Sequence, residues 1–591
     1  MRISGRLCVV ILLVISLQMV VGCGSGTSSG ITTQPPATYT IGGTVSGLVG
    51  AGLVLQNNSG DNQSVSANGS FTFSTSIDSG AAYSVTVSTE PTGQNCTVTN
   101  GSGKASANVM NIQVVCSPIY EWTWMGGSNL IVGISGLVGE PGSYGTLETA
   151  SASNIPGGSA GASSWTGGSG NFWLFGGMGW DDIGHWGFRN ALWEFNPSTN
   201  EWTWMGGADN VGQIAVSGVY GTKETPASGN IPGGRDDFSS WTDSKGNFWL
   251  FGGSGVDANG IAGWLNDLWK FNPSANQWAW MGGSSTVVSN GYNTGVYGTL
   301  ETPDAGNIPG SRYNAASWTD SNGNLWLFGG NGIDANSNVG WLNDLWEFNP
   351  STNQWAWMGG SSTMSILPDT LYGKPGVYGT LGTPAAGNIP GSRNNAASWT
   401  DSNGHLWLFG GNGYDVNSNQ GWLNDLWEFN PSTNQWAWIG GSSVLSGSGQ
   451  NGVYGMLGTP AAGNIPGGRL GAVSWTDSSG HLWLFGGNGY DANGDSSYLN
   501  DLWEYNSTTN QWAWISGNST APTSCHNQGF CGQFGVYGTL GTPAAANMPG
   551  GRTQAVVWTD SSGDVWLFGG SGFAESGSNF GWLNDFWEYQ P

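Results

Sequence analysis

The chain has few charged residues, and basic residues are the scarcest. Of its 591 residues only 9% are Asp, Glu, Lys or Arg, and 13 Lys and Arg stand against 38 Asp and Glu, giving a formal net charge of −25. Because charged residues usually make up about 25% of a soluble domain, Ser, Asn, Thr and Gly must carry much of the solvation here. The sequence contains no cluster of Lys and Arg, so we expect no nucleic-acid partner.

Histidine is almost absent as well. The four histidines are His185, His405, His481 and His526. His405 and His481 occupy one repeated turn position that other repeats fill with Asn or Asp, which indicates turn residues. A copper site needs several converging histidines, and these do not converge in the sequence pattern. With no nucleophile and base pair and no paired catalytic carboxylates in view, we expect no catalytic residue, no metal and no cofactor.

Long hydrophobic runs are missing except at the amino end, where Arg2 and Arg6 precede an apolar run from Leu7 to Val21. That run is short for a membrane span and is typical of a targeting segment. It ends in Val-Val-Gly-Cys, which resembles the lipobox of bacterial lipoproteins. The resemblance implies a signal peptide over 1–22, acylation of Cys23 and a lipidated flexible tether over 23–37. An ordinary cleaved signal peptide is the alternative. We expect an exported protein, anchored in the outer membrane or at the cell surface through the Cys23 lipid.

Cysteine is also scarce, at six residues. Cys8 leaves with the signal peptide and Cys23 takes the lipid, which leaves two pairs that are local in sequence. Such pairs indicate disulfides formed in an oxidising compartment. The predicted disulfides join Cys96 with Cys116 and Cys525 with Cys531.

No segment shows capped helical periodicity, so the chain is predicted to be all-β. Residues 38–118 alternate apolar and polar positions and contain no Trp, which predicts a small β-sandwich stapled by the first cysteine pair. We expect this domain to be a spacer, with a ligand function of its own as the alternative.

The remaining residues, 119–591, are a repeat array. The phrase W-L-F-G-G occurs six times and defines copies 1 to 6, with its Phe at Phe175, Phe251, Phe328, Phe409, Phe485 and Phe568. Each copy holds four runs typical of strands. In copy 3 these are AASWT, LWLFGG, DLWEFN and QWAWMGG, and the first two are joined there by an Asn-Gly turn. The last copy lacks its QWAWMGG phrase, and a matching YEWTWMGG stands around Trp122. Complementary fragments of this kind predict a closed β-propeller in which an N-terminal strand completes the last sheet.

These residues resemble the kelch family, in which a Gly-Gly pair ends one strand and a spaced aromatic and Trp follow. Gly329 and Gly330 followed by Phe348 and Trp355, with six residues between the last two, give that arrangement. The resemblance implies a six-bladed kelch-type propeller over 119–591, similar to the central domain of galactose oxidase. It also implies an alternative function, because the family includes sialic-acid epimerases and oxidases that modify glycans. The Cys-Tyr crosslink and two His ligands of galactose oxidase have no match in this sequence.

Five arginines stand at one position before the first strand of copies 2 to 6. In kelch domains an arginine at this position commonly lies near the mouth of the central channel, so the ring would bind a carboxylate or an acidic loop. The alternative is that each pairs with a nearby aspartate such as Asp344. These candidate ligand-binding residues are Arg235, Arg312, Arg393, Arg469 and Arg552.

The loop after each Gly-Gly carries Asp-x-Asn patterns, for example at Asp334, Asn336 and Asn338. They lack the Gly and bidentate Glu of a calcium loop, so Asx-turns are favoured. The 36 Trp occur at recurring positions and indicate packing between sheets, except Trp180 and Trp186 in the divergent loop of copy 1.

Connections such as residues 452–469 repeat between copies and should gather on one face of the disc, often the binding face. We therefore predict a non-catalytic module at the cell envelope that binds a protein or a glycan on this face. The alternatives are a glycan-modifying enzyme and a structural envelope component.

Overall fold

The computed structural model describes residues 36–48, 51–91, 94–118, 121–131, 138–212, 215–288, 291–366, 372–522, 531–575 and 580–590. Over these residues the protein is all-β, and none of them forms a helix long and apolar enough to cross a membrane. Contacts divide the chain into two compact units, Met1–Ser117 and Pro118–Pro591.

The first unit contains two four-stranded sheets that share a core. One has the order β5 (Gly69–Thr72), β2 (Ile41–Ser46), β10 (Val109–Pro118), β8 (Gln94–Thr99), and the other β4 (Asp61–Val65), β3 (Leu53–Asn57), β7 (Ala82–Thr89), β9 (Ser102–Lys104). The short strands β1 (Thr38–Tyr39) and β6 (Ile77–Asp78) form a separate pair. Alternate residues point inward, so that Ile41, Leu55 and Ile112 are fully buried.

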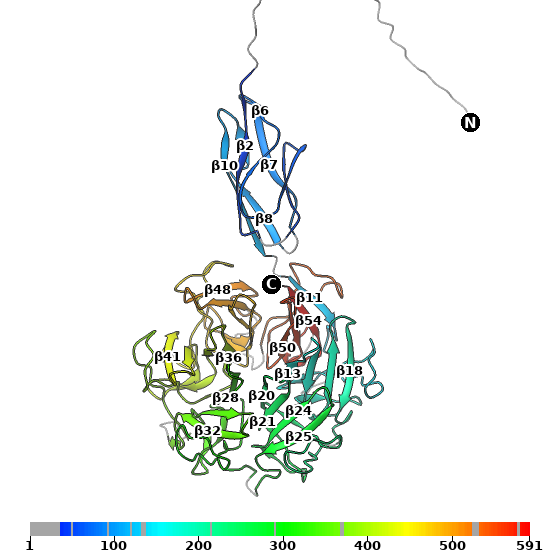
Figure 1. The fold of residues 1–591 in the computed structure, drawn as a ribbon, viewed down its shortest axis with the longest axis vertical. Helices are drawn as coiled ribbons and strands as arrows, with labels where there is room; N and C mark the ends of the chain where they lie inside the picture. Colours follow the sequence, from blue (N-terminus) through cyan, green and yellow to red (C-terminus); the bar gives the residue numbers. More distant parts are fainter. Residues whose placement is uncertain are drawn as a thin grey trace, which may run out of the picture. The chain divides into compact units, whose positions relative to one another are not determined.

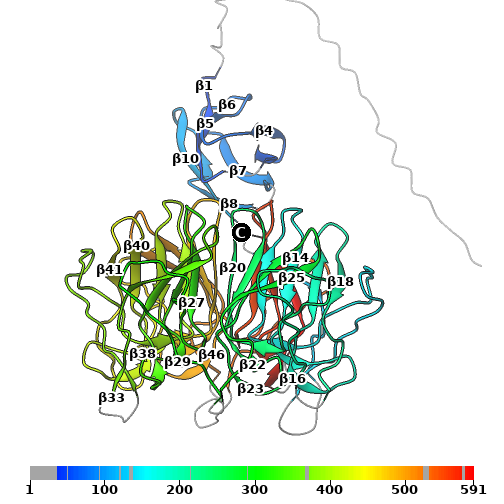
Figure 2. The same ribbon diagram turned by 60° about the horizontal axis from the view of Figure 1, so that its bottom comes forward.

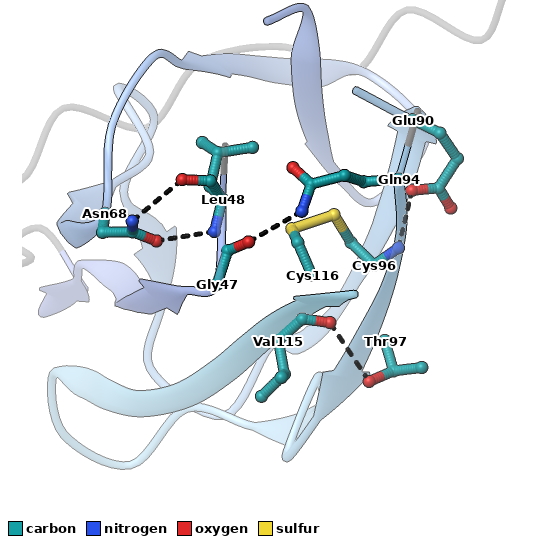
Figure 3. Close-up of a disulfide and its surroundings, with 9 residues drawn as sticks. All are labelled: Gly47, Leu48, Asn68, Glu90, Gln94, Cys96, Thr97, Val115 and Cys116. Atoms are coloured by element: carbon teal, nitrogen blue, oxygen red, sulfur yellow. Dashed lines mark hydrogen bonds between the residues drawn. A yellow bond between two sulfur atoms is a disulfide. The ribbon is translucent and has the colours of Figure 1, made fainter. Parts of the chain in front are cut away.

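The predicted disulfide between Cys96 and Cys116 is present and joins β8 to β10 (Figure 3). Polar contacts surround it, since Gln94 Nε2 donates to the Gly47 carbonyl at 2.7 Å and Cys96 N donates to Glu90 Oε2 at 2.8 Å. The bond therefore ties two neighbouring strands at one end of the unit.

The second unit contains four-stranded antiparallel sheets arranged like the blades of a propeller (Figures 1 and 2). The strand that follows the arginine position lies nearest the centre, and the QWAWMGG strand lies outermost (Figure 1). In copies 1 to 3 the strands are β13 (Ser163–Thr166), β14 (Phe172–Phe175), β17 (Leu192–Asn196), β18 (Glu201–Gly206); β20 (Ser239–Thr242), β21 (Phe248–Phe251), β24 (Leu268–Asn272), β25 (Gln277–Gly282); and β27 (Ala316–Thr319), β28 (Leu325–Phe328), β31 (Leu345–Asn349), β32 (Gln354–Gly359).

The later sheets repeat this order. In copies 4 to 6 the strands are β36 (Ala397–Thr400), β37 (Leu406–Phe409), β40 (Leu426–Asn430), β41 (Gln435–Gly440); β43 (Val473–Thr476), β44 (Leu482–Phe485), β47 (Leu502–Asn506), β48 (Gln511–Ser516); and β50 (Val556–Thr559), β51 (Val565–Phe568), β54 (Phe586–Gln590), β11 (Glu121–Gly126). In the last of these sheets β11 pairs antiparallel with β54, with Trp122 opposite Tyr589. This sheet thus combines residues from both ends of the second unit.

The tryptophans pack between neighbouring sheets. Trp241 and Trp249 of copy 2 share one core cluster with Trp346 and Phe348 of copy 3. Trp346 is fully buried, and the Trp241 indole N–H donates to the Trp326 carbonyl of copy 3 at 3.0 Å. The indoles therefore fill the wedge between sheets and also hold them in register. Trp180 and Trp186 of copy 1, which the sequence set apart from this packing, are partly exposed.

Each copy also has a small three-stranded sheet that the sequence did not predict. Its strands are β12 (Ser159–Ala160), β15 (Met178–Trp180), β16 (Trp186–Phe188); β19 (Arg235–Asp236), β22 (Ser254–Val256), β23 (Ala262–Trp264); β26 (Arg312–Tyr313), β29 (Asn331–Ile333), β30 (Val339–Trp341); β35 (Arg393–Asn394), β38 (Asn412–Tyr414), β39 (Gln420–Trp422); β42 (Arg469–Leu470), β45 (Asn488–Tyr490), β46 (Ser496–Tyr498); and β49 (Arg552–Thr553), β52 (Ser571–Phe573), β53 (Phe580–Trp582). One further pair, β33 (Ser365–Ile366) with β34 (Tyr372–Gly373), lies in a connection.

The Asp-x-Asn loops are the turns of these small hairpins. Asp334 is fully buried, and its Oδ1 accepts the backbone N–H groups of Asn336 and Asn338 at 2.8 Å. Its Oδ2 accepts from the Asn338 side chain and from Met364 N, which belongs to the next connection. These contacts are those of an Asx-turn, as favoured from the sequence, and they leave the carboxylate already bonded.

Candidate functional site

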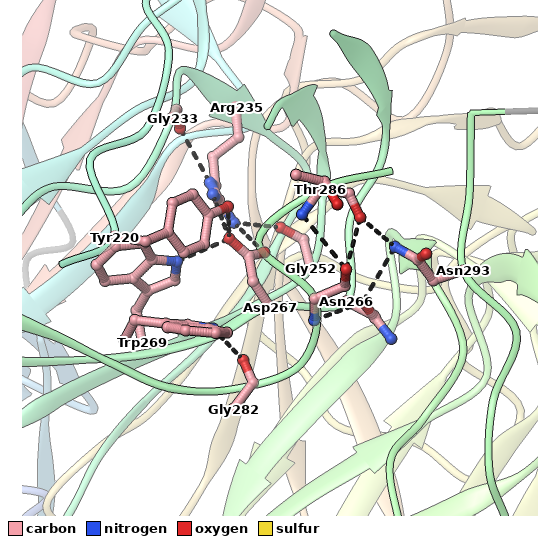
Figure 4. Close-up of polar contacts among 12 residues, drawn as sticks. Tyr220, Gly233, Arg235, Gly252, Asn266, Asp267, Trp269, Gly282, Thr286 and Asn293 are labelled. Carbon is pink, nitrogen blue, oxygen red and sulfur yellow. Dashed lines mark hydrogen bonds and ion pairs between the residues drawn. The ribbon is translucent and has the colours of Figure 1, made fainter. Parts of the chain in front are cut away.

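The five arginines of copies 2 to 6 lie inside their sheets as bidentate ion pairs. Arg235 Nη1 and Nη2 donate to Asp267 Oδ1 and Oδ2 at 2.7 and 2.8 Å (Figure 4). Its other donors reach the carbonyls of Gly233 and Gly252 at 3.0 Å. The same pair recurs in every later copy, as Arg312 with Asp344, Arg393 with Asp425, Arg469 with Asp501 and Arg552 with Asp585.

Two more donors complete each pair. The Tyr220 hydroxyl and the Trp269 indole N–H both donate to Asp267 Oδ2, at 2.6 and 2.7 Å. Burial raises the pKa of Tyr220 well above its ordinary value, and the Asp267 charge adds to this. Tyr220 comes from the connection before copy 2, so the ion pair anchors that connection to its sheet. We call this group of Arg, Asp, Tyr and Trp the clamp.

The clamps place the arginines away from solvent. All five guanidinium groups are at most 1% exposed, and their aspartates are fully buried. This geometry is the alternative that the sequence left open, in which each arginine pairs with a nearby aspartate. These side chains do not form the open ring of arginines at a channel mouth, because their N–H groups already donate to Asp carboxylates and backbone carbonyls.

A different set of residues rings the centre of the second unit. Backbone N–H groups donate from copy to copy around a closed cycle at 2.8–3.1 Å, and every member has a positive φ between 54° and 67°. The six members, one from each copy, are Gly161, Asp237, Asn314, Asn395, Gly471 and Gln554. We call this cycle the collar. It surrounds a small cavity of about 160 Å³.

Copy 2 makes one corner of the collar acidic. Asp237 Oδ2 accepts from Asn314 Nδ2 at 2.9 Å and Oδ1 accepts from Gln554 Nε2 at 2.7 Å. Burial raises the pKa of Asp237 to about 6, against the effect of the Asn314 hydrogen bond. Burial and then the Asp237 charge raise the pKa of the adjacent Asp236 well above its ordinary value. The collar is therefore symmetric in backbone but not in charge.

Hydroxyl groups line the inner strands beyond the collar. Ser317 Oγ and Thr319 Oγ1 donate to the carbonyls of Ser240 and Thr242 in the preceding copy, both at 3.3 Å. The cavity between the inner strands measures about 480 Å³ and is lined by such Ser and Thr residues together with Trp. Most of these hydroxyls already donate a hydrogen bond to a carbonyl of the neighbouring sheet.

Grooves open between successive sheets at the outer strands of copies 1 to 4. Their volumes are about 470, 550 and 630 Å³. In the largest, Trp357, Met358 and Val377 supply an apolar wall, and Glu301 and Asn388 supply polar groups. The connections form one side of each of these grooves. The sequence predicted that the connections gather on one face of the disc, but it did not predict a groove.

Three glutamates in the connections have left-handed backbones, and two of them, Glu148 and Glu301, line grooves. Glu148, Glu224 and Glu301 have φ of 56°, 62° and 58°, whereas copies 4 to 6 carry Gly382, Gly458 and Gly541 there, also with positive φ. A residue with a side chain costs about 1 kcal/mol more than glycine in this conformation. Each Glu accepts a hydrogen bond from a turn Asn of the next copy, at 2.6–2.8 Å. A carboxylate is thus kept at two of the grooves, by Glu148 and Glu301, despite backbone strain.

Titratable groups converge at the inner hairpins of copies 4 to 6. Asp401, His405 and Glu428 bring three ligand atoms within 4.8 Å, and so do Asp477, His481 and Glu504 in copy 5 and Asp560, Asp564 and Glu588 in copy 6. His405 Nδ1 contacts Glu428 Oε1 at 2.5 Å. Asp401 already accepts two backbone N–H groups and the Trp407 indole, which supports the turn interpretation of His405.

The remaining cysteines fall in part outside the described residues. Cys23 and Cys525 lie there, so the structure does not describe the lipidation site or the second predicted pair. Cys531 is described and is disulfide-bonded.

Comparisons with known proteins add little to this picture. No family model matches the chain, and no curated protein matches it. Among solved structures, 253 chains match. One of them, reported as the structure of YjhT, is 15% identical with a TM-score of 0.40, over 73% of this chain and 95% of that chain.

Proposed function

We propose that this protein is an exported, lipid-anchored, six-bladed kelch-type propeller that binds a glycan without catalysis. The grooves carry the proposal, because they recur at equivalent places on neighbouring sheets. The pairing of β11 with β54 and the six-membered collar support a closed six-bladed ring. The lipobox-like residues before Cys23 support the anchor.

The chemistry of the grooves favours a sugar. A pyranose presents C–H groups on its faces and hydroxyls around its edge, and aromatic and carboxylate groups complement these two features. Trp204 with Glu148, and Trp357 with Glu301, supply that combination in two grooves. Two similar grooves on one molecule suit a polymer with repeating units, since linked sites raise avidity without new contacts.

The test is a glycan array and titration with the full chain, comparing wild type with the triple variant E148G, E224G and E301G. The variant carries the residue found in copies 4 to 6, so the backbone is accommodated. We expect the melting temperature to change little and the affinity for the selected glycan to fall at least tenfold. A matched control, Asp78→Asn, removes an exposed carboxylate from the first unit and should leave affinity unchanged.

Three results would count against the proposal. Full affinity in the triple variant would remove the grooves from binding. Capture of a protein ligand with no glycan bound would favour the protein-binding alternative, and turnover of the glycan would favour the enzyme. For the anchor, Cys23→Ser should move the chain from the membrane fraction to the soluble fraction, and retention in the membrane would contradict lipidation.

A further inference from the structure

Copy 1 lacks both charged members of the clamp. Ser159 stands where copies 2 to 6 have arginine, and Ala191 stands where they have the aspartate, as in Arg235 and Asp267. Ala191 and Ser159 are both buried. The place that holds a carboxylate in every other copy therefore has none of its own in copy 1.

A second arginine reaches the same place from another position. Arg189 replaces the leucine that the other copies carry, such as Leu265, and its Nη1 donates to the carbonyls of Gly157 and Trp180 at 2.8 and 3.0 Å. The counterpart of Gly157 is Gly233, whose carbonyl accepts from Arg235 in copy 2. The guanidinium group is thus restored although its carboxylate is not.

No carboxylate among the described residues pairs with Arg189, which is 2% exposed. Asp181 is not a substitute, because copy 2 has its counterpart Asp257 in addition to Asp267. The Asp181 oxygens also already accept the backbone N–H groups of Ile183, His185 and Val211. A buried charge without a counter-charge is strongly unfavourable, so a partner is required.

The indole donor of the clamp remains in place in copy 1 without its acceptor. Trp193 Nε1 is buried and has no hydrogen-bond partner, and neither has Arg189 Nε. In copy 2 the equivalent indole of Trp269 donates to Asp267 Oδ2. The Tyr144 and Trp193 rings lie 4.7 Å apart, as do Tyr220 and Trp269, so the aromatic frame is unchanged.

We propose that copy 1 binds a small monovalent anion at the place of the missing carboxylate, held by Arg189 and the Trp193 indole N–H. Alanine differs from aspartate by one carboxylate group, so the site takes an ion of that size, such as chloride or formate. Burial raises the pKa of Tyr144, against the effect of the Arg189 charge, so its hydroxyl stays protonated. That hydroxyl is hydrogen-bonded to Arg189 and belongs to the same frame.

The test measures thermal stability of the full chain at constant ionic strength in sodium chloride, sodium formate and sodium isethionate, whose anion is too large for the site. We expect the wild-type melting temperature to be higher in chloride or formate and to saturate as one site fills. The better of these two anions distinguishes a halide site from a carboxylate site. Where chloride is the better anion, a crystal grown in bromide should show an anomalous peak beside Arg189 and Trp193.

The matched variants are Ala191→Asp, which supplies the carboxylate found in the other copies, and Ala191→Asn, which fills the same space without charge. The Asp variant should melt higher than wild type in isethionate and lose its dependence on the anion. The Asn variant should lose that dependence without the gain. Equal wild-type melting in all three salts would overturn the proposal, and so would an anion dependence that the Ala191→Asp variant keeps.

Discussion

Arg312 and Asp344 meet inside copy 3 as a bidentate ion pair, with both N–O distances at 2.8 Å. Arg312→Ala would leave the Asp344 carboxylate buried without its counter-charge. Breaking one side of a buried pair costs about 3–5 kcal/mol. We expect a loss of that size in the free energy of unfolding, measured by chemical denaturation.

Lys223→Ala is the control for this loss, because that lysine is exposed and its ion pair with Glu224 is long, at 3.9 Å. It should change stability by less than about 0.5 kcal/mol. A near-neutral Arg312→Ala, combined with lost binding of an acidic ligand, would return the arginines to the ligand-binding role predicted from sequence.

Trp122 tests the closure of the last sheet. It is 1% exposed and lies opposite Tyr589 across the β11 and β54 pair. Trp122→Ala should cost about 3–5 kcal/mol, as for other buried aromatic residues. Glu121→Ala, a partly exposed neighbour on the same strand, should cost much less, and equal losses would argue against tight packing of β11.

The Cys96 to Cys116 bond should stabilise the first unit alone, since both residues belong to it. Closing a loop of sequence separation 20 contributes about 3 kcal/mol. Replacing both cysteines by Ala should lower the unfolding transition of residues 38–118 in calorimetry and leave the larger transition in place. A shift of the larger transition instead would show that the two units unfold together.

Glu588 predicts a pH dependence. Burial, and then the charges of Asp564 and Asp560, raise its pKa to about 7. The folded state binds the Glu588 proton more tightly than the unfolded state does. The contribution of this proton to the free energy of unfolding is therefore present in full below about pH 4.5 and is lost as pH rises towards 7. The free energy of unfolding of Glu588→Gln should therefore rise relative to that of wild type by roughly 1–2 kcal/mol between these pH values, after discounting for partial exposure.

Asp564→Asn provides the check on this assignment. Removing the Asp564 charge should lower the pKa of Glu588 and so reduce the loss of stability between about pH 4.5 and 7, as Glu588→Gln does. A profile that is unchanged by both substitutions would place the titrating group elsewhere.

Sequence periodicity and turn chemistry predicted the large strands well, because both are local. The run LWLF corresponds to β28, and the Asn-Gly turn before it is held by Asp320, which accepts backbone N–H groups of Asn322 and Asn324. The sequence did not predict the small hairpins, because strands such as β29 have only three residues with a glycine at the centre and show no apolar alternation. The cysteine pair of the first unit was predicted from spacing and compartment.

The site was harder to predict because its parts come from different positions in the repeat. Arg189 stands on a leucine position, so aligning the copies shows a lost arginine rather than a relocated one. One signal was available for the grooves, since Glu148, Glu224 and Glu301 align with glycines. Only the backbone angles show that those positions are left-handed, and hence that the glutamates are strained.

The collar has a mechanical consequence. Its six backbone hydrogen bonds form a closed cycle, so no member can move outward without stretching the hydrogen bonds to its two neighbours. The aperture it encloses is therefore fixed in diameter while the sheets remain assembled. Adjustment of the second unit to a bound molecule must take place in the peripheral connections, where no such circuit exists among the described residues.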